Sequence, residues 1–253
     1  MPEDPTLAEE GSQQPVRAFV LHSGGIDSSV CLYLAAEAFG IENTVALSIY
    51  YGQRHAVEID AAQNICDRLG CEHHIIKGLD LPESMLTRKD SIIPNVSYDE
   101  LGPGISPTYV PFRNGNLLSC AAAIAQSQYG VALYFGAHAE DAQNWAYPDC
   151  TPEFIGAMAN AIYVGTYHQV RLITPLEWLT KKDIIDWGTR LRVPWELTWS
   201  CYKGESLHCG LCPTCRARNE GFIAAGQIDP TQYAIDPYAP ASPPTDADDE
   251  IPF

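Results

Sequence analysis

Residues 19–29 read Phe-Val-Leu-His-Ser-Gly-Gly-Ile-Asp-Ser-Ser, an apolar run followed by paired glycines and a serine-rich helix start. In an α/β fold this order predicts a strand, a tight turn and a helix whose N-terminus cradles a phosphate. The glycines let the backbone approach an anion, and exposed N–H groups and the positive end of the helix dipole bind it. A kinase-type P-loop is excluded, because no Gly-Lys-Ser/Thr follows. The alternative interpretation is a glycine turn without a ligand. The candidate phosphate-binding residues are His22, Ser23, Gly24, Gly25, Ile26, Asp27, Ser28 and Ser29.

Strands and helices alternate outward from this loop. The expected strands cover 17–22, 44–50, 72–77, 131–135 and 170–173, and the expected helices cover 28–39, 55–69, 114–129, 152–167 and a stretch that begins near 180. This alternation predicts an α/β fold with a mostly parallel, doubly wound sheet covered on both faces. Such sheets bind ligands at the carboxyl ends of their strands, so the polar loops at 23–29, 51–55 and 136–141 are predicted to form one site. A proline- and glycine-rich connection over 90–111 is typical of a lid or a substrate loop.

Composition and charge narrow the class of protein. With 253 residues and 46% hydrophobic content, the chain can form one large domain with a small appendage. No apolar run approaches the roughly 18 residues that span a bilayer, and the start lacks the basic and apolar regions of a signal peptide. The net charge of −17 argues against a protein that grips nucleic acid, which normally presents a basic surface. We therefore expect a cytoplasmic protein that acts on a small molecule, with no direct nucleic-acid partner and no membrane partner.

Much of the negative charge lies at the two ends of the chain. Residues 1–15 carry four acidic residues and no basic one, and residues 236–253 carry five acidic residues and five prolines. Such segments bury little apolar surface. The chain is therefore predicted to have a flexible acidic tail over 1–16, an α/β domain over 17–195, a zinc-binding segment over 196–233 and a flexible, acidic, proline-rich tail over 234–253.

Four of the nine cysteines crowd into one short stretch: Cys201, Cys209, Cys212 and Cys215. Two of the gaps have the usual length of a metal clip, and four soft thiolates predict a closed structural zinc site that supplies folding energy. An iron–sulfur cluster and a redox dithiol are the alternatives. His208 could replace one thiolate, but beside a full set of cysteines it is interpreted as a bystander.

Four further residues combine a reactive side chain with a suggestive position. Lys181 starts a predicted helix, where the dipole disfavours a cation, so a bound phosphate would explain it; a solvated lysine is the alternative. Arg113 precedes an apolar helix and either pairs with a carboxylate or phosphate or lies in water. Asp149 either accepts paired N–H donors of a purine-like ring or favours a helix start. Cys150 is a nucleophile, a substrate contact or a buried thiol.

In this order the motifs make the chain resemble the 7-cyano-7-deazaguanine synthase family, a queuosine-pathway group of the N-type ATP pyrophosphatases. The resemblance covers about residues 17–233. Besides Ser23–Ser28, it rests on Tyr51-Gly52-Gln53-Arg54-His55, Tyr109-Val110-Pro111-Phe112-Arg113-Asn114, Glu140-Asp141, Tyr147-Pro148-Asp149-Cys150, the stretch from Pro175 to Lys181, and Thr198-Trp199-Ser200-Cys201-Tyr202 with the cysteines. The glycine loop alone would fit GMP, NAD and asparagine synthetases and tRNA-thiolating enzymes equally well. The ordered combination is specific.

The resemblance implies an ATP-dependent carbon–nitrogen ligase with a fold of the adenine-nucleotide alpha-hydrolase type. The family converts 7-carboxy-7-deazaguanine to the nitrile with ammonia and ATP, through an acyl-adenylate, an amide and a second adenylation. ATP, Mg²⁺ and Zn²⁺ are the implied cofactors, and a homodimer is implied. The implied catalytic residues are Ser23, Asp27, Arg113 and Lys181, with Asp27 holding or orienting the magnesium ion. The implied substrate-binding residues are Arg54, Arg113, Asn114, Asp141, Tyr147 and Asp149.

Two departures keep other functions open. The acidic ends lie outside the family core, and Asn114-Gly115-Asn116 places a glycine where a helix starts, so the shape of the substrate loop can differ. One alternative is a related ligase that joins the adenylated deazaguanine carboxylate to a protein or another amine and stops at the amide. The other is a zinc-ribbon nucleic-acid-binding protein, against which the acidic charge and the phosphate loop argue.

Overall fold

A computed structural model describes residues 16–52, 57–79, 81–82, 84–88, 91–98, 100, 104–142, 145–203 and 206–237. Its centre is a five-stranded sheet in the order β3-β2-β1-β4-β5, and each described pairing is parallel. The strands are β1 (Arg17–Leu21), β2 (Thr44–Tyr50), β3 (Glu72–Lys77), β4 (Gly130–Tyr134) and β5 (Arg171–Ile173). The prediction of a doubly wound parallel sheet is confirmed. The phosphate loop follows the central strand β1. The strand order changes direction there, because β2 and β3 lie on one side of β1 and β4 and β5 lie on the other.

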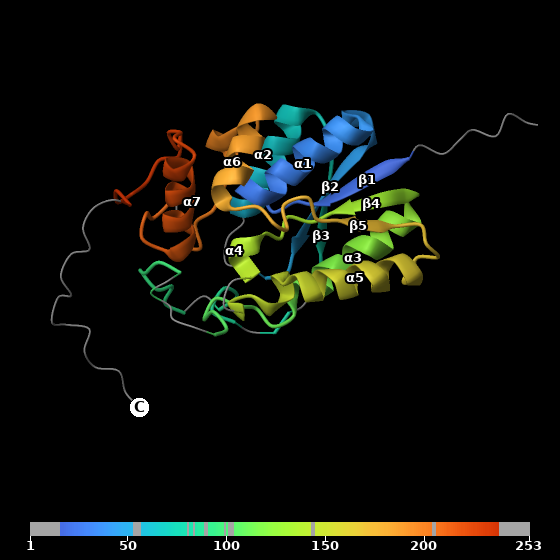
Figure 1. Ribbon diagram of the computed structural model, residues 1–253, viewed down its shortest axis with the longest axis horizontal. Coiled ribbons are helices and arrows are strands. Elements are labelled where there is room, and N and C mark those ends of the chain that lie inside the picture. Colours follow the sequence, from blue (N-terminus) through green and yellow to red (C-terminus); the bar gives the residue numbers. More distant parts are fainter. Residues whose placement is uncertain are drawn as a thin grey trace, which may run out of the picture.

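Helices cover both faces of this sheet (Figure 1). One layer holds α1 (Ile26–Phe39), α2 (Val57–Leu69) and α6 (Lys181–Arg190), and the other holds α3 (Arg113–Ser127) and α5 (Pro152–Gly165). Alternate residues of β1 supply the two cores. Ala18 and Val20 pack with the α1 layer, whereas Phe19 and Leu21 pack with the α3 layer. A strand buried on both sides explains why residues 18–21 are continuously apolar.

Local backbone geometry ends two of the predicted helices early. Helix α3 stops at Ser127, and Tyr129 adopts a positive φ of 60° just beyond it. Helix α5 stops at Gly165, and Tyr167 and His168 follow with φ of 54° and 65°. Residues in this left-handed region cannot continue a right-handed helix, and they close its last turn instead.

The cysteine-rich segment leads into α7 (Pro213–Ala224), which packs against the α/β core. Phe222 of α7 is 1% exposed and meets the Trp195 ring edge-on at 5.7 Å between ring centroids. Arg218 is also 1% exposed and forms a two-pronged ion pair with Asp229. Phe222 therefore packs the segment against the α/β core, whereas the ion pair joins α7 to the stretch that follows it. A short helix, α4 (Ala139–Ala142), completes the set.

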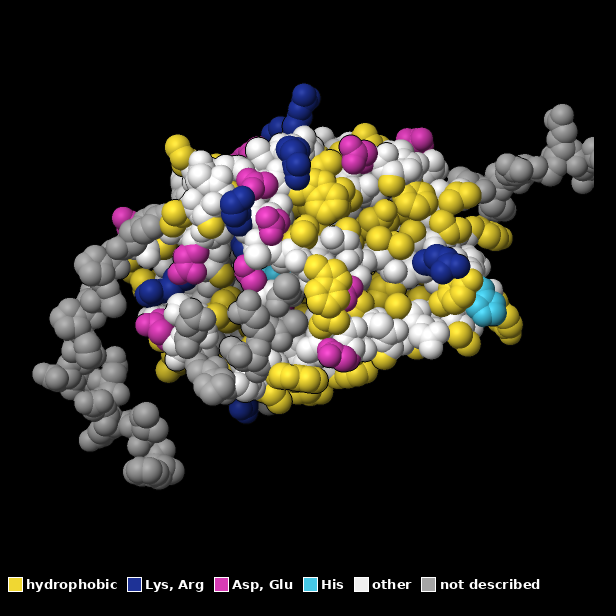
Figure 2. All heavy atoms as spheres, viewed as in Figure 1, with side chains coloured by type: hydrophobic (Ala, Val, Ile, Leu, Met, Phe, Trp, Pro, Cys, Tyr) yellow, Lys and Arg dark blue, Asp and Glu magenta, His cyan; other side chains and the backbone are white. Residues whose placement is uncertain are grey.

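The part of the chain that the structure describes contains no helix long and apolar enough to cross a membrane. Among the described residues on the face shown in Figure 2, acidic and basic side chains are interspersed, mostly over α6 and α7.

Candidate active site

The phosphate loop is tightly constrained by its glycines. Gly24 has a positive φ of 81°, and a Cβ there would lie 2.6 Å from the carbonyl oxygen of Glu58 and 2.8 Å from the backbone nitrogen of Ala62. Only glycine fits between the loop and α2 at this position. Gly25 is the N-cap of α1 and supplies no side chain to its first N–H groups. Those N–H groups and the helix dipole therefore suit an anionic ligand.

The serines of the loop are bonded to one another and to the backbone. Ser23 Oγ lies 3.1 Å from Ser28 Oγ and accepts the N–H of Gly25 at 3.3 Å. Ser29 is fully buried, and its hydroxyl donates to the carbonyl of Gly25 at 2.7 Å. Ser29 therefore stabilises the turn from behind, whereas Ser23 and Ser28 line the cavity beside it.

A charged cluster stands next to the loop. Lys181 Nζ donates to Asp27 Oδ1 at 2.6 Å and lies 3.0 Å from Nε2 of His138, which is 3.3 Å from a carboxylate oxygen of Asp141. Burial raises the pKa of Asp27, but the Lys181 ammonium and His138 outweigh it, so the net pKa lies below its ordinary value. Burial lowers the pKa of Lys181, but Asp27 and Asp141 raise it further, so the ammonium is retained. The site thus holds an ionised carboxylate and a cation side by side.

The start of α6 fixes Lys181 in this place. Thr180 caps the helix, and with Asp183 it forms a capping box. The backbone N–H of Lys181 donates to Glu140 Oε1 at 3.0 Å. An acidic neighbour and Asp27 thus account for a lysine at a helix N-terminus, where the dipole alone would disfavour it. His138 is the residue of this cluster that sequence reasoning did not single out, although its loop was predicted to face the site.

Arg113 forms a second cationic position at the start of α3. Its Nη1 lies 3.4 Å from the hydroxyl of Tyr51, and its guanidinium stands 6.0 Å from that ring centroid. Burial raises the pKa of Glu58 to about 7, with Arg113 opposing the shift.

Gly115, the glycine that the sequence places at the start of α3, has a packing role: a Cβ on Gly115 would lie 2.2 Å from the ring of Phe112. Gly115 therefore lets that ring fold over the first turn of α3.

Asp149 lies behind the cavity wall. It is 3% exposed, and its Oδ2 accepts the backbone N–H of Asn114 at 2.9 Å. Burial raises its pKa, while that N–H and Arg113 oppose the shift. The Asn114 amide donates to the Asp149 carbonyl and to Cys150 Sγ, each at 3.2 Å. The carboxylate therefore stabilises the first turn of α3, and its predicted contact with substrate stays a prediction. Burial raises the pKa of Cys150 well above its usual range, which disfavours a thiolate nucleophile.

Hydroxyl groups and aromatic rings form the far end of the cavity. The Tyr147 hydroxyl lies 2.6 Å from Thr108 Oγ1 and accepts from Ser106 Oγ at 3.3 Å. Tyr98 and Tyr202 join their hydroxyls at 3.3 Å, and the Tyr98 ring meets Tyr147 edge-on at 6.2 Å. Only Tyr147 was predicted as a site residue. Tyr98 and Tyr202 lie in features that the sequence analysis did note, the long loop over 90–111 and the Trp-Ser-Cys-Tyr motif, but these features did not single out either tyrosine.

One cavity of about 1060 Å³ joins these groups. It is large enough for a nucleotide and a second small molecule. The predicted residues on its wall are His22, Ser23, Gly25, Ile26, Asp27, Ser28, Arg113, Asn114, Asp141, Tyr147 and Lys181. Gly24, Ser29 and Asp149 are not on the wall, and Arg54 lies outside the described residues.

His22 is 2% exposed, and among the described residues neither of its ring nitrogens has a hydrogen-bond partner. Burial, with His73 nearby, lowers its pKa to about 3, so the ring is neutral.

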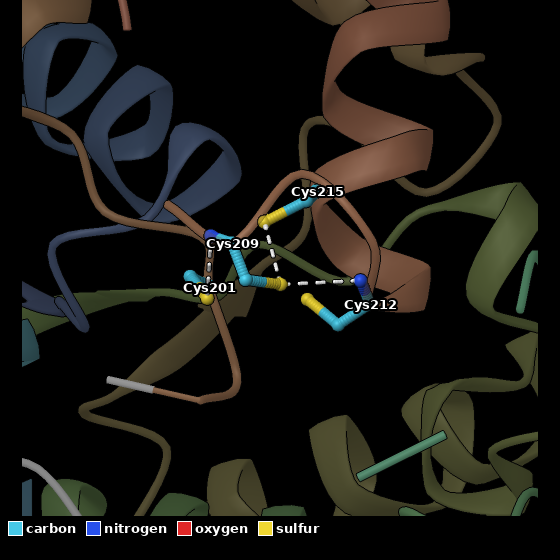
Figure 3. A group of neighbouring side chains, drawn as sticks. All are labelled: Cys201, Cys209, Cys212 and Cys215. Atoms are coloured by element: carbon cyan, nitrogen blue, oxygen red, sulfur yellow. Dashed lines mark hydrogen bonds between the residues drawn. The ribbon is translucent and has the colours of Figure 1, made fainter. Parts of the chain in front are cut away.

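The four cysteines converge as a compact sulfur cluster (Figure 3). Their Sγ atoms all lie within 4.8 Å of one another, and all four side chains are buried. Backbone N–H groups point at the sulfurs: Cys212 donates to Cys209 Sγ at 3.2 Å, and Cys209 donates to Cys201 Sγ at 3.4 Å. These bonds favour charged thiolates. The prediction of a four-cysteine metal site is supported by this geometry.

The cluster also packs against the long loop. Leu86, Ile93 and Val110 are buried against the cysteines, and Lys203 Nζ donates to Asn95 Oδ1 at 2.7 Å. The cysteine segment therefore borders the loop that leads to Arg113.

The chain is similar to several known proteins. The family model described as "Queuosine biosynthesis protein QueC" matches residues 17–226. The 7-cyano-7-deazaguanine synthase of Thermoplasma volcanium is 42% identical over 228 residues, which cover 87% of this chain and 92% of that protein. That of Nostoc punctiforme is 39% identical over 228 residues, which cover 87% of this chain and 100% of that protein. Among solved structures, the U34-tRNA thiolase NcsA from Methanococcus maripaludis is similar with a TM-score of 0.47 and 20% identity, over 75% of this chain and 61% of that one.

Proposed function

Since this chain belongs to the queuosine biosynthesis protein QueC family, we propose that it converts 7-carboxy-7-deazaguanine, ammonia and ATP to 7-cyano-7-deazaguanine. The chain is an ATP-dependent ligase of the 7-cyano-7-deazaguanine synthase type. The observation that carries the proposal is the single cavity that joins the phosphate loop and Lys181 to Arg113 and the tyrosine hydroxyls. A phosphate donor and an aromatic acid can therefore meet in one cavity.

The first chemical step is an attack of the substrate carboxylate on the α-phosphorus of ATP. The carboxylate oxygen forms a bond to phosphorus, the bond to the β-phosphate oxygen breaks, and pyrophosphate leaves. Ser23, the first N–H groups of α1 and Lys181 line or border the cavity and would stabilise the β- and γ-phosphates. These donors are preorganised by the glycine turn, so little rearrangement is needed when charge shifts onto the leaving group.

The ionised Asp27 carboxylate suits a magnesium ion, which prefers oxygen ligands. It is 26% exposed at its side chain and lies on the cavity wall. Asp27 would hold or orient this ion. When bound, magnesium neutralises phosphate charge during the displacement. Lys181, which now pairs with Asp27, would then be free to contact phosphate oxygens.

In the following steps ammonia adds to the acyl-adenylate carbonyl, loses a proton, and displaces AMP to give the amide. The amide oxygen then attacks the α-phosphorus of a second ATP and a second pyrophosphate leaves. Loss of AMP and of the two protons of the amide nitrogen gives the nitrile. The cavity residues must exclude water, which would hydrolyse the adenylate. Arg113 and the hydroxyls of Tyr147, Tyr98 and Tyr202 would bind and orient the deazaguanine ring.

For the cysteine cluster we propose a structural zinc ion. Four buried thiolates satisfy a tetrahedral ion completely and leave no position for substrate, so the ion would supply folding energy rather than chemistry. We also expect a homodimer located in the cytoplasm, which light scattering and cell fractionation would test.

Mass spectrometry tests the proposed reaction directly. After incubation with ATP, magnesium, ammonium and 7-carboxy-7-deazaguanine, we expect the nitrile together with AMP and pyrophosphate. Accumulation of the amide alone, or of an adduct on a protein, would instead indicate the related ligase. Neither that alternative nor the nucleic-acid-binding alternative is favoured by an observation in hand.

A further inference from the structure

The cysteine cluster is connected to the phosphate loop through the segment that precedes Cys201. The backbone N–H of Trp199 donates to the carbonyl of Gly24 at 2.8 Å. A Cβ on Gly25 would lie 3.5 Å from the carbonyl oxygen of Trp199. Gly24 is also packed against Glu58 of α2 on its other side. The glycine turn is therefore held between α2 and residue 199.

His208 fixes the position of this segment. Its Nε2 accepts the backbone N–H of Ser200 at 3.0 Å, and its ring packs on the Trp199 indole at 4.2 Å between ring centroids. The side chain is 4% exposed. Because Nε2 accepts this bond, it is a lone pair of the neutral ring that holds Ser200. His208 directly precedes Cys209 but is not part of the four-cysteine group, and its Nε2 is bonded to Ser200.

The other contacts of the segment reach the same core. The Trp199 indole N–H donates to the carbonyl of Cys201 at 2.9 Å. Arg218 donates to Thr198 Oγ1 at 2.7 Å and to Ser200 Oγ at 3.3 Å. Residues 198–200 are thus bonded to Arg218 through their side chains and to His208 and Gly24 through their backbone. The bond from Ser200 to His208 is next in the chain to the bond from Trp199 to Gly24.

We propose that His208 is a positioning residue for the phosphate loop: through Ser200 and Trp199 it sets the place of the Gly24–Gly25 turn and thereby the affinity for the triphosphate. This inference rests on the proposed function, because it takes residues 23–29 to be the ATP-binding loop. The physical reason is geometric. Binding by preorganised N–H groups falls steeply when they are displaced, and removing the acceptor of the half-buried Ser200 N–H would release the segment for such a displacement.

Three variants separate this role from a general effect on folding. His208→Leu removes the acceptor and keeps an apolar side chain. His208→Gln places an amide oxygen near the position of Nε2 and restores an acceptor for Ser200. His168→Leu is the matched control, because His168 is exposed and far from the loop in the fold.

The readouts are the dissociation constant of a non-hydrolysable ATP analogue with magnesium by calorimetry, the KM for ATP against kcat, the bound zinc per chain and Tm. For His208→Leu we expect the dissociation constant and the KM for ATP to rise about tenfold, the scale of one lost buried hydrogen bond. The KM for the deazaguanine acid should change much less, and bound zinc should stay as in the unaltered chain. His208→Gln should recover most of the affinity. His168→Leu should leave the affinity for ATP as in the unaltered chain, and should lower only Tm, because leucine is strained at the positive φ of residue 168.

His208→Leu with unchanged ATP affinity would overturn the proposal, and so would a loss that His208→Gln fails to rescue at full zinc content. If His208→Leu does not retain its zinc, His208→Asn makes the same comparison with His208→Gln, because its shorter amide cannot reach Ser200. Failure of the proposed function looks different: the unaltered chain itself would then not bind the ATP analogue.

Discussion

Each end of the cavity has an aspartate near a helix start, Asp27 on the cavity wall and Asp149 behind it, and the pKa values of these two carboxyl groups shift in opposite directions. At the nucleotide end, Asp27 pairs with Lys181 Nζ at 2.6 Å, and the cation keeps its pKa below the ordinary value despite burial. At the aromatic end, Asp149 is 3% exposed and its bonded donor is the backbone N–H of Asn114, so burial raises its pKa. The comparison teaches that a close cation, more than burial or residue type, decides in which direction the pKa of a largely enclosed carboxyl group moves.

The contrast fits the two ligands of the proposed reaction. A triphosphate with a metal ion calls for paired charges that can exchange partners, and Asp27 with Lys181 provides them. A planar heterocycle calls for directional hydroxyls and rings, and the tyrosine cluster provides those. Between the two ends lies Glu58, an acid whose burial Arg113 offsets only in part.

Removing the charge at the nucleotide end should have the largest effect. Asp27→Asn, and separately Ser23→Ala, should lower the rate of pyrophosphate release by about 100- to 1000-fold, the scale of a lost preorganised contact in a transition state. Pyrophosphate release and circular dichroism are to be measured together, since folding should be intact. Near-normal release from both variants would remove the loop from the mechanism.

Loss of the metal ion from the cysteine cluster should destabilise both ends of the cavity. The cluster packs against the long loop, and the segment before Cys201 is bonded to the phosphate loop. Cys209→Ser should lose the bound zinc and lower Tm by about 10 °C, since a structural site supplies several kcal/mol of folding energy. We expect one zinc per chain by metal analysis before the change. Iron in place of zinc, or active protein without metal, would contradict the assignment.

At the aromatic end the key comparison is between two changes of Asp149. Asp149→Ala should raise the KM for the deazaguanine acid about tenfold, and more than the KM for ATP, because α3 loses the acceptor for Asn114 and Arg113 shifts with it. Asp149→Asn keeps an acceptor and should behave nearly as the unaltered chain. If Asn is as harmful as Ala, the carboxylate itself contacts the ring of the substrate, as the motif first suggested.

The smallest expected effect is on stability at Glu58. Its folded pKa of about 7 lies above the ordinary value of 4.5, so between these values the folded state holds a proton that the unfolded state has lost. Stability from this group therefore falls as pH rises through that window. Glu58→Gln should raise Tm by a few degrees at pH 8 and leave it unchanged at pH 4. Equal Tm for both proteins at pH 8 would show that Arg113 fully offsets the burial.

Several features of the fold could be predicted because their causes are local in the chain. The order of strands and helices follows from apolar periodicity and from the glycines that end helices. Four cysteines within one short stretch are close in space because they are close in the chain. The same reasoning failed where a partner comes from elsewhere. Lys181 and Asp27 are 154 residues apart in the chain, and neither motif predicts that the two side chains form a pair. His208 lies outside the group of four cysteines, as predicted, but its bond to Ser200 could not be predicted, because the chain does not show that Ser200 lies beside its ring.

By itself, the sequence determined the parallel α/β fold, the phosphate loop, the cysteine cluster and the family, because each is written in contiguous residues with narrow steric or chemical demands. The tertiary structure decided which charges pair, that Asp149 faces α3 and not the cavity, and that tyrosines from three separate segments share one network. Those outcomes depend on distances of a few ångströms between segments far apart in the chain. Hydrogen bonds and ion pairs at that range are set by packing, which no single stretch of sequence specifies.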